Sequence, residues 1–393
     1  MQILSLNNMR EIYFDNSATT KMSARAIEKM TSVARECYGN PSSLHSVGLS
    51  AERAIGEARG IILSSLGILR PQRGELVFTA GGTEANNMAI IGTALAKAHR
   101  GGEKIIITEG EHSSVEECAK YLETKGFTIV RAPTRGGELD IDFIRANSKG
   151  AILCSLMQVN NETGALYDVK TAFEVVKEQS PDCITHIDAV QSYLKVKFTK
   201  KSVGADLISL SAHKVNGAKG VGALYIAPEL LKAKKITPVI LGGGQEFGLR
   251  SGTENVYGIC AFGEAVREHT ERLNDEIETM RELREYIISH LPSEIRANLP
   301  KKSAPHIINI TLPKIKSETA LHALSARGIF VSSGSACSSN SAHKASRALV
   351  AFGLTEDEAD SSLRISLCPQ STKDEADALI EALYEIIKQL ARK

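Results

Sequence analysis

The sequence predicts an α/β protein with one large, mostly parallel sheet domain and a smaller α+β domain. Short apolar runs alternate with amphipathic segments of helical period along most of the chain, and a cluster of polar residues follows many of these runs. Continuously apolar strands are typical of a parallel sheet that is covered on both faces. Because ligands bind beyond the carboxyl ends of such strands, the polar clusters are the candidate functional residues.

The expected elements follow in chain order. A first helix should begin after Ser23 and end before Gly39, and a second should run from about 49 to 66. Strands and helices then alternate, with strands at 76–78, 104–107, 127–130, 151–157, 184–188 and 207–210, helices at 84–97, 113–125, 141–146 and 169–178, and a further apolar run at 223–226.

A long charged helical pattern at about 256–290 leads into the second domain. That domain should contain strands at 307–310 and 363–367, a strand and loop at 329–337, and helices at 318–327 and 373–390. We therefore expect a large domain at 15–257, and a small domain formed by 1–14 and 258–393 that carries a mobile cysteine loop at 332–341.

Lys214 is the first catalytic candidate. It follows the apolar strand 207–210 together with Ser211 and His213, and glycines come next. A lysine at the end of a core strand suits a Schiff-base amine, because desolvation there lowers the pKa of the amine. An ordinary loop lysine is the alternative, and the Ser-x-His-Lys pattern alone would favour it.

A phosphate site is the second candidate. Gly81, Gly82 and Thr83 form a small-residue turn between a strand and a helix, where backbone N–H groups and the helix dipole favour an anion. The turn matches neither the P-loop nor the G-x-G-x-x-G pattern, which argues against nucleoside triphosphates and NAD.

Three further residues at strand ends would suit an aromatic ring with a cationic nitrogen. Asp188 lies at a buried strand end, where a carboxylate needs a cation such as a protonated pyridine nitrogen; a buried salt bridge is the alternative. His112 could stack on the ring or simply cap the next helix. Gln191 could donate a hydrogen bond to a ring hydroxyl oxygen.

Composition excludes several function classes. The 47 basic and 46 acidic residues nearly cancel, so no general attraction to nucleic acid or to an anionic membrane is expected. No apolar run is long enough to span a membrane and the N-terminus lacks a leader pattern, so we expect a cytoplasmic protein. The seven cysteines show no C-x-x-C and no cluster with histidine, which argues against disulfides and metal sites. Cys337 differs from the others because small polar residues surround it.

With these motifs in place, the chain resembles the pyridoxal-phosphate enzymes of fold type I, and within them the cysteine desulfurases of the NifS/IscS class in the class V aminotransferase family. The resemblance covers nearly the full length. Its marks are the motifs at 13–20, 39–43 with His45, 83–84, 111–112, 159–164, 186–191, 211–214, 250–253, 332–337 and 363–367.

The resemblance implies a cofactor and a role for each matched residue. Pyridoxal 5'-phosphate would be bound covalently by Lys214, at its ring nitrogen by Asp188 and on its ring face by His112. The remaining cofactor contacts would come from Gly82, Thr83, Gln191, Ser211, His213 and, from the second subunit of a homodimer, Thr253.

The resemblance also implies a substrate and a reaction. Asn161 and Arg364 would bind the carboxylate of L-cysteine, with guanidinium well suited to a bidentate contact. Lys214 would be a candidate base at the α-carbon, and Cys337 as thiolate would take the sulfur, which leaves alanine and a persulfide. The persulfide would pass to an acceptor protein, either an iron–sulfur scaffold or a tRNA-thiolation enzyme.

Two differences from the family pattern leave the identity of the sulfur-acceptor protein open. The stretch from Cys337 to 347–349 is shorter than in the housekeeping IscS members, and Cys368 follows the motif at 363–367. A selenocysteine lyase or an aminotransferase-like relative is the nearest alternative. A catalytically idle scaffold for sulfur-transfer partners is an alternative of a different class. Nucleic-acid binding is the least supported, because the chain contains no Trp and no basic-aromatic interleaving.

Overall fold

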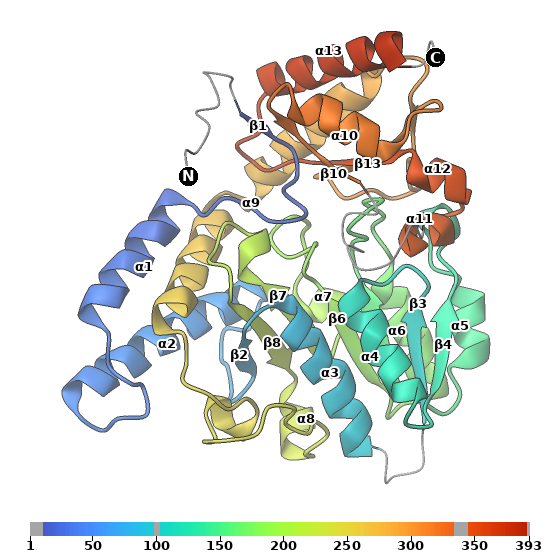
Figure 1. Cartoon of the computed structure of the whole chain (residues 1–393). Coiled ribbons are helices and arrows are strands. Elements are labelled where there is room, and N and C mark those ends of the chain that lie inside the picture. The colour runs from blue at the N-terminus through green and yellow to red at the C-terminus, as the bar shows by residue number, and fades with distance from the viewer. Residues whose placement is uncertain (1–10, 98–102, 334–344, 391–393) are drawn as a thin grey trace.

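The computed structural model describes residues 11–97, 103–333 and 345–390. The chain forms a larger part around a seven-stranded sheet and a smaller part around a four-stranded sheet, shown in the lower and upper halves of Figure 1. Each part has its own large cluster of buried apolar side chains. The predicted α/β class with a second α+β unit is confirmed. The domain boundaries expected from the sequence stay a prediction.

The large sheet has the strand order β2-β8-β7-β6-β5-β3-β4. Strand β8 runs antiparallel to β7 and β2, and the other pairings are parallel. All seven residues of β5 are buried, as a strand covered on both faces requires. The bounds are β2 (Leu76–Thr79), β3 (Lys104–Thr108), β4 (Thr128–Ala132), β5 (Ala151–Met157), β6 (Ile184–Asp188), β7 (Leu207–Ser211) and β8 (Gly222–Ile226).

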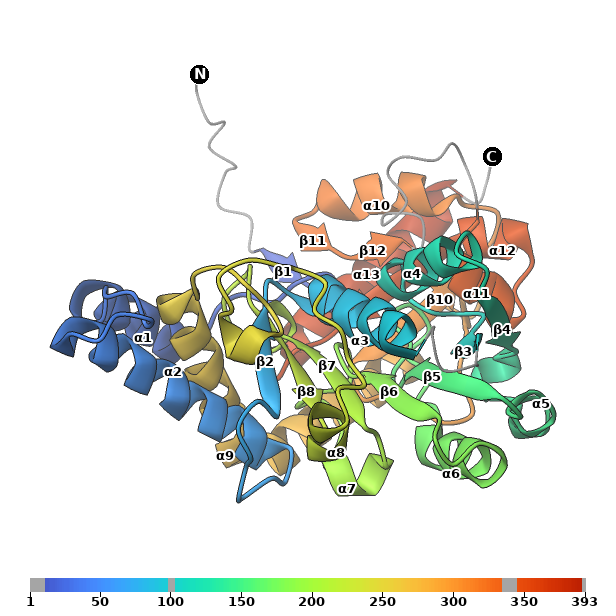
Figure 2. The same cartoon turned by 90° about the horizontal axis from the view of Figure 1, so that it is seen from below.

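Helices cover both faces of this sheet. In Figure 2, α3 (Gly82–Lys97) and α4 (Ser113–Glu123) lie on one face, and α5 (Ile141–Asn147) and α6 (Val169–Gln179) lie on the other. Short helices complete the connections: α7 (Lys200–Val203), α8 (Pro228–Lys232), and the 3₁₀ turns η1 (Arg135–Gly137), η2 (Ala212–Lys214) and η3 (Glu246–Gly248).

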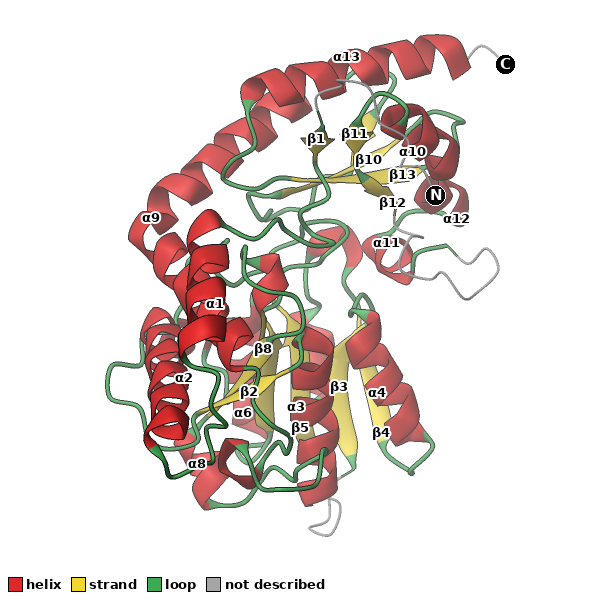
Figure 3. Ribbon diagram, turned by 60° about the vertical axis from the view of Figure 1, so that its left-hand side comes forward, coloured by secondary structure: helices red, strands yellow, loops and turns green. Residues whose placement is uncertain are grey.

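Three helices lie beside the β2 end of the sheet. They are α1 (Ala24–Glu36), α2 (Ser46–Ser65) and the first half of α9 (Val256–Ser289). Figure 3 shows α9 continuing from these helices into the smaller part of the molecule. This helix therefore connects the two apolar cores. No helix in the described parts of the chain is long and apolar enough to cross a bilayer.

The smaller part contains the antiparallel sheet β12-β13-β10-β9 and a parallel pair formed by β1 and β11. The N-terminal strand thus joins elements that lie more than three hundred residues later. The bounds are β1 (Ile12–Tyr13), β9 (Arg296–Ala297), β10 (Ile307–Thr311), β11 (Ile329–Phe330), β12 (Ser332–Ser333), β13 (Ser362–Ser366), α10 (Ser317–Ser325), α11 (Arg347–Phe352), α12 (Glu356–Asp360) and α13 (Lys373–Leu390).

Most expected elements are present, and the differences have local causes. The Ser23 hydroxyl accepts a hydrogen bond from the Ala26 amide and starts α1 as expected. Helix α2 begins at Ser46 rather than near 49, because the His45 ring accepts from the Gly48 amide and caps it. The short helices α11 and α12 were not predicted. Most of the expected mobile loop 332–341 lies outside the described residues.

The contact between α2 and α9 gives a test of the packing. A Cβ atom at Gly263 would lie 2.8 Å from the Cβ of Ala58, whereas one at Gly60 would have no heavy atom within 4 Å. We expect Gly263→Ala to destabilise the fold by about 1–3 kcal/mol through overpacking. The matched Gly60→Ala should raise stability by about 0.5–1 kcal/mol through helix propensity. Thermal unfolding of both variants measures this, and equal effects would contradict the close α2–α9 contact.

Candidate active site

A cavity of about 310 Å³ lies at the carboxyl ends of the central strands. Ten of the residues predicted from the sequence line it: Gly82, Thr83, His112, Asn161, Asp188, Gln191, Ser211, His213, Lys214 and Arg364. Thr253 does not line this cavity in the single chain and is exposed. Cys337 lies outside the described residues. The fold therefore brings together predicted residues from six separate segments of the sequence.

Asp188 ends β6 and is only 6% exposed. Its Oδ1 accepts a hydrogen bond of 2.9 Å from the Val190 amide, and its Oδ2 accepts one of 2.7 Å from the Asn86 side chain. Both donors are neutral, so neither compensates the charge of the carboxylate. A buried carboxylate in this position favours a cationic group in the cavity.

His112 caps α4 and lines the cavity at the same time. Its Nδ1 accepts from the Ser114 amide at 3.1 Å and lies 2.8 Å from the Ser114 hydroxyl. Burial lowers the pKa of His112, and the nearby Asp188 opposes that shift. A ring that accepts at Nδ1 is fixed in orientation. The two interpretations of His112 offered by the sequence are therefore compatible.

Asn86 was missed by the sequence reasoning. Its amide donates to Asp188 and, at 2.9 Å, to the Ser114 hydroxyl, so it links the carboxylate to the residue that orients His112. The available signal was a polar side chain on the buried face of α3, where Ala85 and Met88 are its neighbours.

Lys214 lies in η2, directly after β7 and its C-terminal Ser211. Its Nζ donates to the carbonyl oxygens of Ser17 at 2.6 Å and Ala18 at 2.7 Å. The motif at 13–20 is thus a wall of the site that contacts Lys214 through its backbone. This contact cannot be predicted from side-chain patterns in the sequence, because both acceptors are backbone carbonyls.

Several buried polar atoms around the cavity have no hydrogen-bond partner within the described residues. They are Ser211 Oγ, Asn86 Oδ1, Gln191 Oε1 and Arg364 Nε. Gln191 donates through its nitrogen to the Ser17 carbonyl at 2.8 Å. Buried polar groups normally find partners, so this set fits a polar ligand with acceptors and donors of its own.

The opposite ends of the cavity differ in chemistry. At one end, Gly82 and Thr83 open α3, and a Cβ at Gly82 would lie 2.6 Å from Val190 Cγ2, so only glycine fits there. His213 lines the same end, and burial together with the Lys214 charge lowers its pKa to about 4. Backbone amides and hydroxyl groups at this helix start suit a phosphate.

Cations gather at the other end. Arg364, from β13 of the smaller part, is 4% exposed and donates to Asp15 Oδ1 at 2.8 Å and to the Asn161 carbonyl at 3.0 Å. Burial, with added repulsion from Lys214, lowers the pKa of the nearby Lys195 to about 7. The structure thus brings Asn161 and Arg364 together as predicted. A guanidinium that lines the cavity suits a carboxylate ligand.

Helix α11 fixes two loops of the site from the side of the smaller part. Arg347 Nη1 pairs with Glu116 at 2.7 Å, and its Nη2 donates to the Glu111 carbonyl, next to His112, at 3.2 Å. The Ser346 hydroxyl donates to Glu162, next to Asn161. The loops that carry His112 and Asn161 are therefore both bonded to the start of α11.

Pyridoxal phosphate has a phosphate, a basic ring nitrogen and an aldehyde, and each of these would meet a complementary group in the cavity. The residues present fit this group, since the Ser211 hydroxyl, which has no partner among the described residues, and the buried Asp188 carboxylate line the same cavity. Fold and cavity together are those of the fold type I class of pyridoxal-phosphate enzymes. The chain belongs to the aminotransferase class-V family, whose model matches residues 12–379.

The chain is similar over its whole length to proteins of the NifS/IscS class. It is 39% identical to a cysteine desulfurase IscS of Dictyoglomus turgidum, over 97% of this chain and 95% of the relative. It is 36% identical to cysteine desulfurase IscS 1 of Archaeoglobus fulgidus, over 96% of this chain and 97% of the relative. Among solved structures, a NifS-like protein has a TM-score of 0.90 at 34% identity, over 97% of this chain and 100% of that one.

Glu111 beside the site gives a pH-dependent prediction. Its Oε1 accepts from Thr108 and from the Met157 amide, and burial, with Asp188 adding to it, raises the pKa of its carboxyl to about 8. At pH values between the pKa of Glu111 in the unfolded chain and its folded pKa of about 8, the folded state binds more protons than the unfolded state. The stability contributed by protonated Glu111 is therefore lost as pH rises through this window.

Glu111→Gln keeps the acceptor oxygen and removes the titration. We expect the stability advantage of the variant over the parent to grow from pH 5 to pH 8, by at most about 1.4 kcal/mol per pH unit. Urea unfolding of cofactor-free protein at several pH values measures this. The exposed Glu117→Gln serves as control, and a constant difference between Glu111→Gln and parent would refute the prediction.

Proposed function

We propose that this chain is a cysteine desulfurase that uses pyridoxal 5'-phosphate, converts L-cysteine to L-alanine and transfers the sulfur to Cys337. The observation that carries the proposal is the single cavity in which Lys214, Asp188 and Arg364 meet, in a chain similar throughout to proteins named cysteine desulfurase. Cysteine is also the ligand named in the solved structure of a similar protein, SspA, which is 31% identical with a TM-score of 0.79 over 92% of this chain.

The predicted residues of the cavity share the work of the proposed reaction. Pyridoxal phosphate, when bound, supplies an electron sink next to the α-carbon of the substrate. When the cofactor is bound, Asp188 would keep its ring nitrogen protonated and His112 would contact its ring face. Lys214 would hold the cofactor aldehyde, and its Nζ would accept the α-proton of cysteine. Arg364 and Asn161 orient the substrate carboxylate.

The remaining predicted residues bind the cofactor at its edges. Gly82, Thr83, Ser211 and His213 contact the phosphate, and Gln191 contacts the ring oxygen. The support is their place in the wall of one cavity and the unpartnered Ser211 hydroxyl. Backbone and hydroxyl donors bind a phosphate without a formal positive charge from each residue.

Cys337 acts as the sulfur acceptor in the proposed reaction. Its thiolate attacks the substrate sulfur, the carbon–sulfur bond breaks, and the net products are L-alanine and a Cys337 persulfide. The described flanks of its segment support this role. Ser332 pairs with Arg364 between β12 and β13, and Ser346 bonds to Glu162, the neighbour of Asn161. Both flanks thus contact residues next to the substrate-carboxylate site.

The persulfide passes to an acceptor protein. The IscS names of the relatives favour an iron–sulfur scaffold, and a tRNA-thiolation enzyme is the second candidate. We place the protein in the cytoplasm, which agrees with the free thiols of its six described cysteines. A selenocysteine lyase stays an alternative, because the cavity residues do not distinguish sulfur from selenium.

A homodimer completes the proposed site. Thr253 is exposed and lies outside the cavity of its own chain. A second cavity of about 740 Å³ shares Gly82, Thr83 and His213 with the first and is bordered by the exposed Val239 and Ile240. Exposed apolar side chains at the rim of a ligand cavity are typical of an interface. We therefore propose that Thr253 of a second copy contacts the phosphate.

The reaction predicts different losses for two variants. Cys337→Ala should lower sulfide and alanine production from L-cysteine with reductant by more than about 100-fold, as loss of a covalent nucleophile does, and should keep the yellow colour of the cofactor. Lys214→Ala should lose the activity and also the covalent attachment of the cofactor to the protein after borohydride reduction. Cys37→Ser serves as control. Unchanged alanine production by Cys337→Ala would refute the mechanism, and colourless protein would favour the idle scaffold.

The dimer predicts complementation between two variants. A heterodimer of one Lys214→Ala chain and one Thr253→Ala chain, isolated with two affinity tags, has one intact site if Thr253 acts across the interface. We expect it to bind cofactor with parental affinity at half the sites, whereas the Thr253→Ala homodimer binds more weakly. Weak binding at every functional site of the heterodimer would show that Thr253 acts within its own chain.

A further inference from the structure

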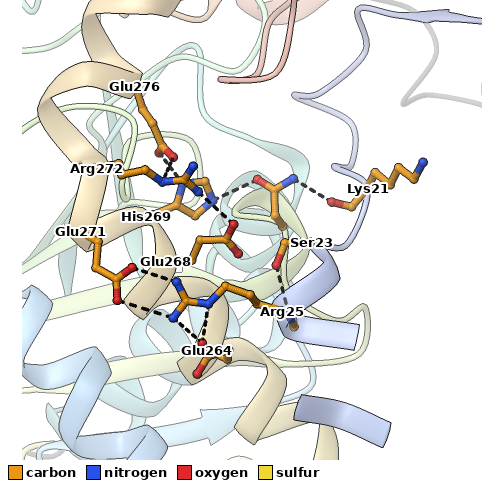
Figure 4. A network of polar contacts seen from close by, with 11 residues as sticks. Lys21, Ser23, Arg25, Glu264, Glu268, His269, Glu271, Arg272 and Glu276 are labelled. Carbon is orange, nitrogen blue, oxygen red and sulfur yellow. Dashed lines mark hydrogen bonds and ion pairs between the residues drawn. The ribbon is translucent and has the colours of Figure 1, made fainter. Parts of the chain in front are cut away.

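A polar network outside the cavity connects α9 to the segment that carries Lys214. Figure 4 shows His269 of α9 beside Glu276, which lies two turns further along the same helix. On its other side, His269 contacts the side-chain amide of Asn216, which in turn donates to the Lys21 carbonyl. His269 and Glu276 are each 6% exposed, and Asn216 is 8% exposed. The cofactor and substrate residues proposed above use none of these three side chains.

Asn216 lies two residues after Lys214 in an unusual backbone conformation. Its φ is +57°, in the left-handed region that few residues other than glycine adopt. The backbone N–H of Asn216 donates to the Thr20 hydroxyl at 2.8 Å, and the backbone carbonyl of Asn216 accepts from the Ser23 amide. Thr20 in turn donates to the His213 carbonyl. The conformation at Asn216 therefore determines how the Lys214 segment meets the N-terminal segment 17–23.

The side-chain amide of Asn216 has a defined orientation. Its nitrogen donates to the Lys21 carbonyl at 2.7 Å, so its oxygen faces His269 Nε2 at 3.0 Å. An oxygen in that position needs a donor, so Nε2 carries a proton. On the other side of the ring, Nδ1 lies 2.5 Å from the carboxylate Oε2 of Glu276. Both ring nitrogens therefore face acceptors.

These two contacts require one proton more than a neutral imidazole and a carboxylate supply. The pair satisfies both only as an imidazolium with a carboxylate, or as an imidazole with a carboxylic acid. When that proton leaves, one ring nitrogen presents a lone pair either to Glu276 or to Asn216. Either arrangement breaks a buried hydrogen bond, which carries a desolvation penalty.

We propose that His269 is a positioning residue for Lys214, and that the proton it shares with Glu276 maintains its hydrogen bond to Asn216. Through Asn216, this pair stabilises the left-handed turn after Lys214 and the contact of that turn with Thr20 and Lys21. The inference rests on the proposed role of Lys214 and adds a requirement for a protonated group outside the cavity.

Other charged groups surround the pair. On α9, Arg272 Nε lies 3.7 Å from the second oxygen of Glu276, and Arg272 Nη2 donates to Glu268. From α1, Arg25 pairs with Glu264 and Glu271. From the Lys214 loop, Lys219 lines a cavity together with Asn216 and Glu268. The positive and negative charges among these surrounding groups are equal in number. The shared proton therefore distinguishes His269 and Glu276 from the charged groups around them.

The test compares four variants of the holoenzyme. His269→Gln removes the imidazole. Glu276→Gln allows a neutral imidazole to keep its Nε2 proton for Asn216 while the new amide donates to Nδ1. Asn216→Gly permits a positive φ and removes only the side chain. Glu278→Gln, in an exposed pair with Arg281 on the same helix, is the control.

We expect His269→Gln and Asn216→Gly to lower kcat about 10-fold with KM for L-cysteine within about twofold, since positioning of Lys214 affects the reaction more than substrate binding. Both should shift the pH dependence of the absorbance of the cofactor bound at Lys214 and speed hydrogen exchange in segment 20–23. Glu276→Gln should keep kcat within about threefold and should keep parental hydrogen exchange in segment 20–23, because the neutral ring still donates its Nε2 proton to Asn216.

Parental kcat, absorbance profile and exchange in both His269→Gln and Asn216→Gly would overturn the proposal, even if their melting temperatures fell. A Glu276→Gln variant as impaired as His269→Gln would overturn the assignment of the shared proton. If His269→Gln does not fold, Asn216→Gly carries the test alone. Activity and cofactor colour retained by Lys214→Ala would instead refute the proposed function, so the two failures are distinguishable.

Discussion

The buried carboxylate of Asp188 is the constraint on which the site depends. Asp188 is 6% exposed, and its hydrogen-bond donors among the described residues are the neutral Val190 amide and Asn86 side chain. A buried carboxylate in such surroundings is unfavourable without a cation nearby. The residues around Asp188 hold its carboxylate in place through a chain of hydrogen bonds. Asn86 fixes one oxygen, Ser114 connects Asn86 to His112, and Lys214 lies across the same cavity. A cationic aromatic ring between these groups satisfies all of them at once.

The site also depends on a segment that belongs to neither sheet alone. Between β1 and α1, Asp15 pairs with Arg364 of the smaller part, and the Ser17 carbonyl accepts from Lys214 of the larger part. Arg364 and Lys214 are therefore both bonded to a stretch of three residues. Placing the domain boundary at 14–15, as the sequence suggested, divides a segment whose contacts connect the two parts.

Sequence could predict what is locally encoded. The strand ends at Asp188 and Ser211 follow from continuous apolar runs, and the start of α1 follows from Ser23, whose hydroxyl bonds three residues away. It could not predict contacts that tertiary structure creates. Asn86 donates to Asp188, which lies 102 residues later in the chain. Neither the helix propensity of Asn86 nor its spacing from other polar residues predicts that contact. The antiparallel direction of β8 is likewise decided by pairing with β2 and β7, and not by its own apolar pattern.

The polar pair His269 and Glu276 lies in the middle of α9, between the parts of the helix that pack in the two apolar cores. The first half of the helix, up to Val266, contributes to the core of the larger part, and the second half, from Met280, contributes to the core of the smaller part. His269 and Glu276 lie between these two stretches. An apolar pair there would merge the cores without fixing how the helix is rotated, because apolar contacts are non-directional. The His269–Glu276 hydrogen bond lies within α9, whereas the bond from His269 to Asn216 is directional and joins the helix to another segment. That second bond fixes the rotation of α9 relative to the segment of Lys214.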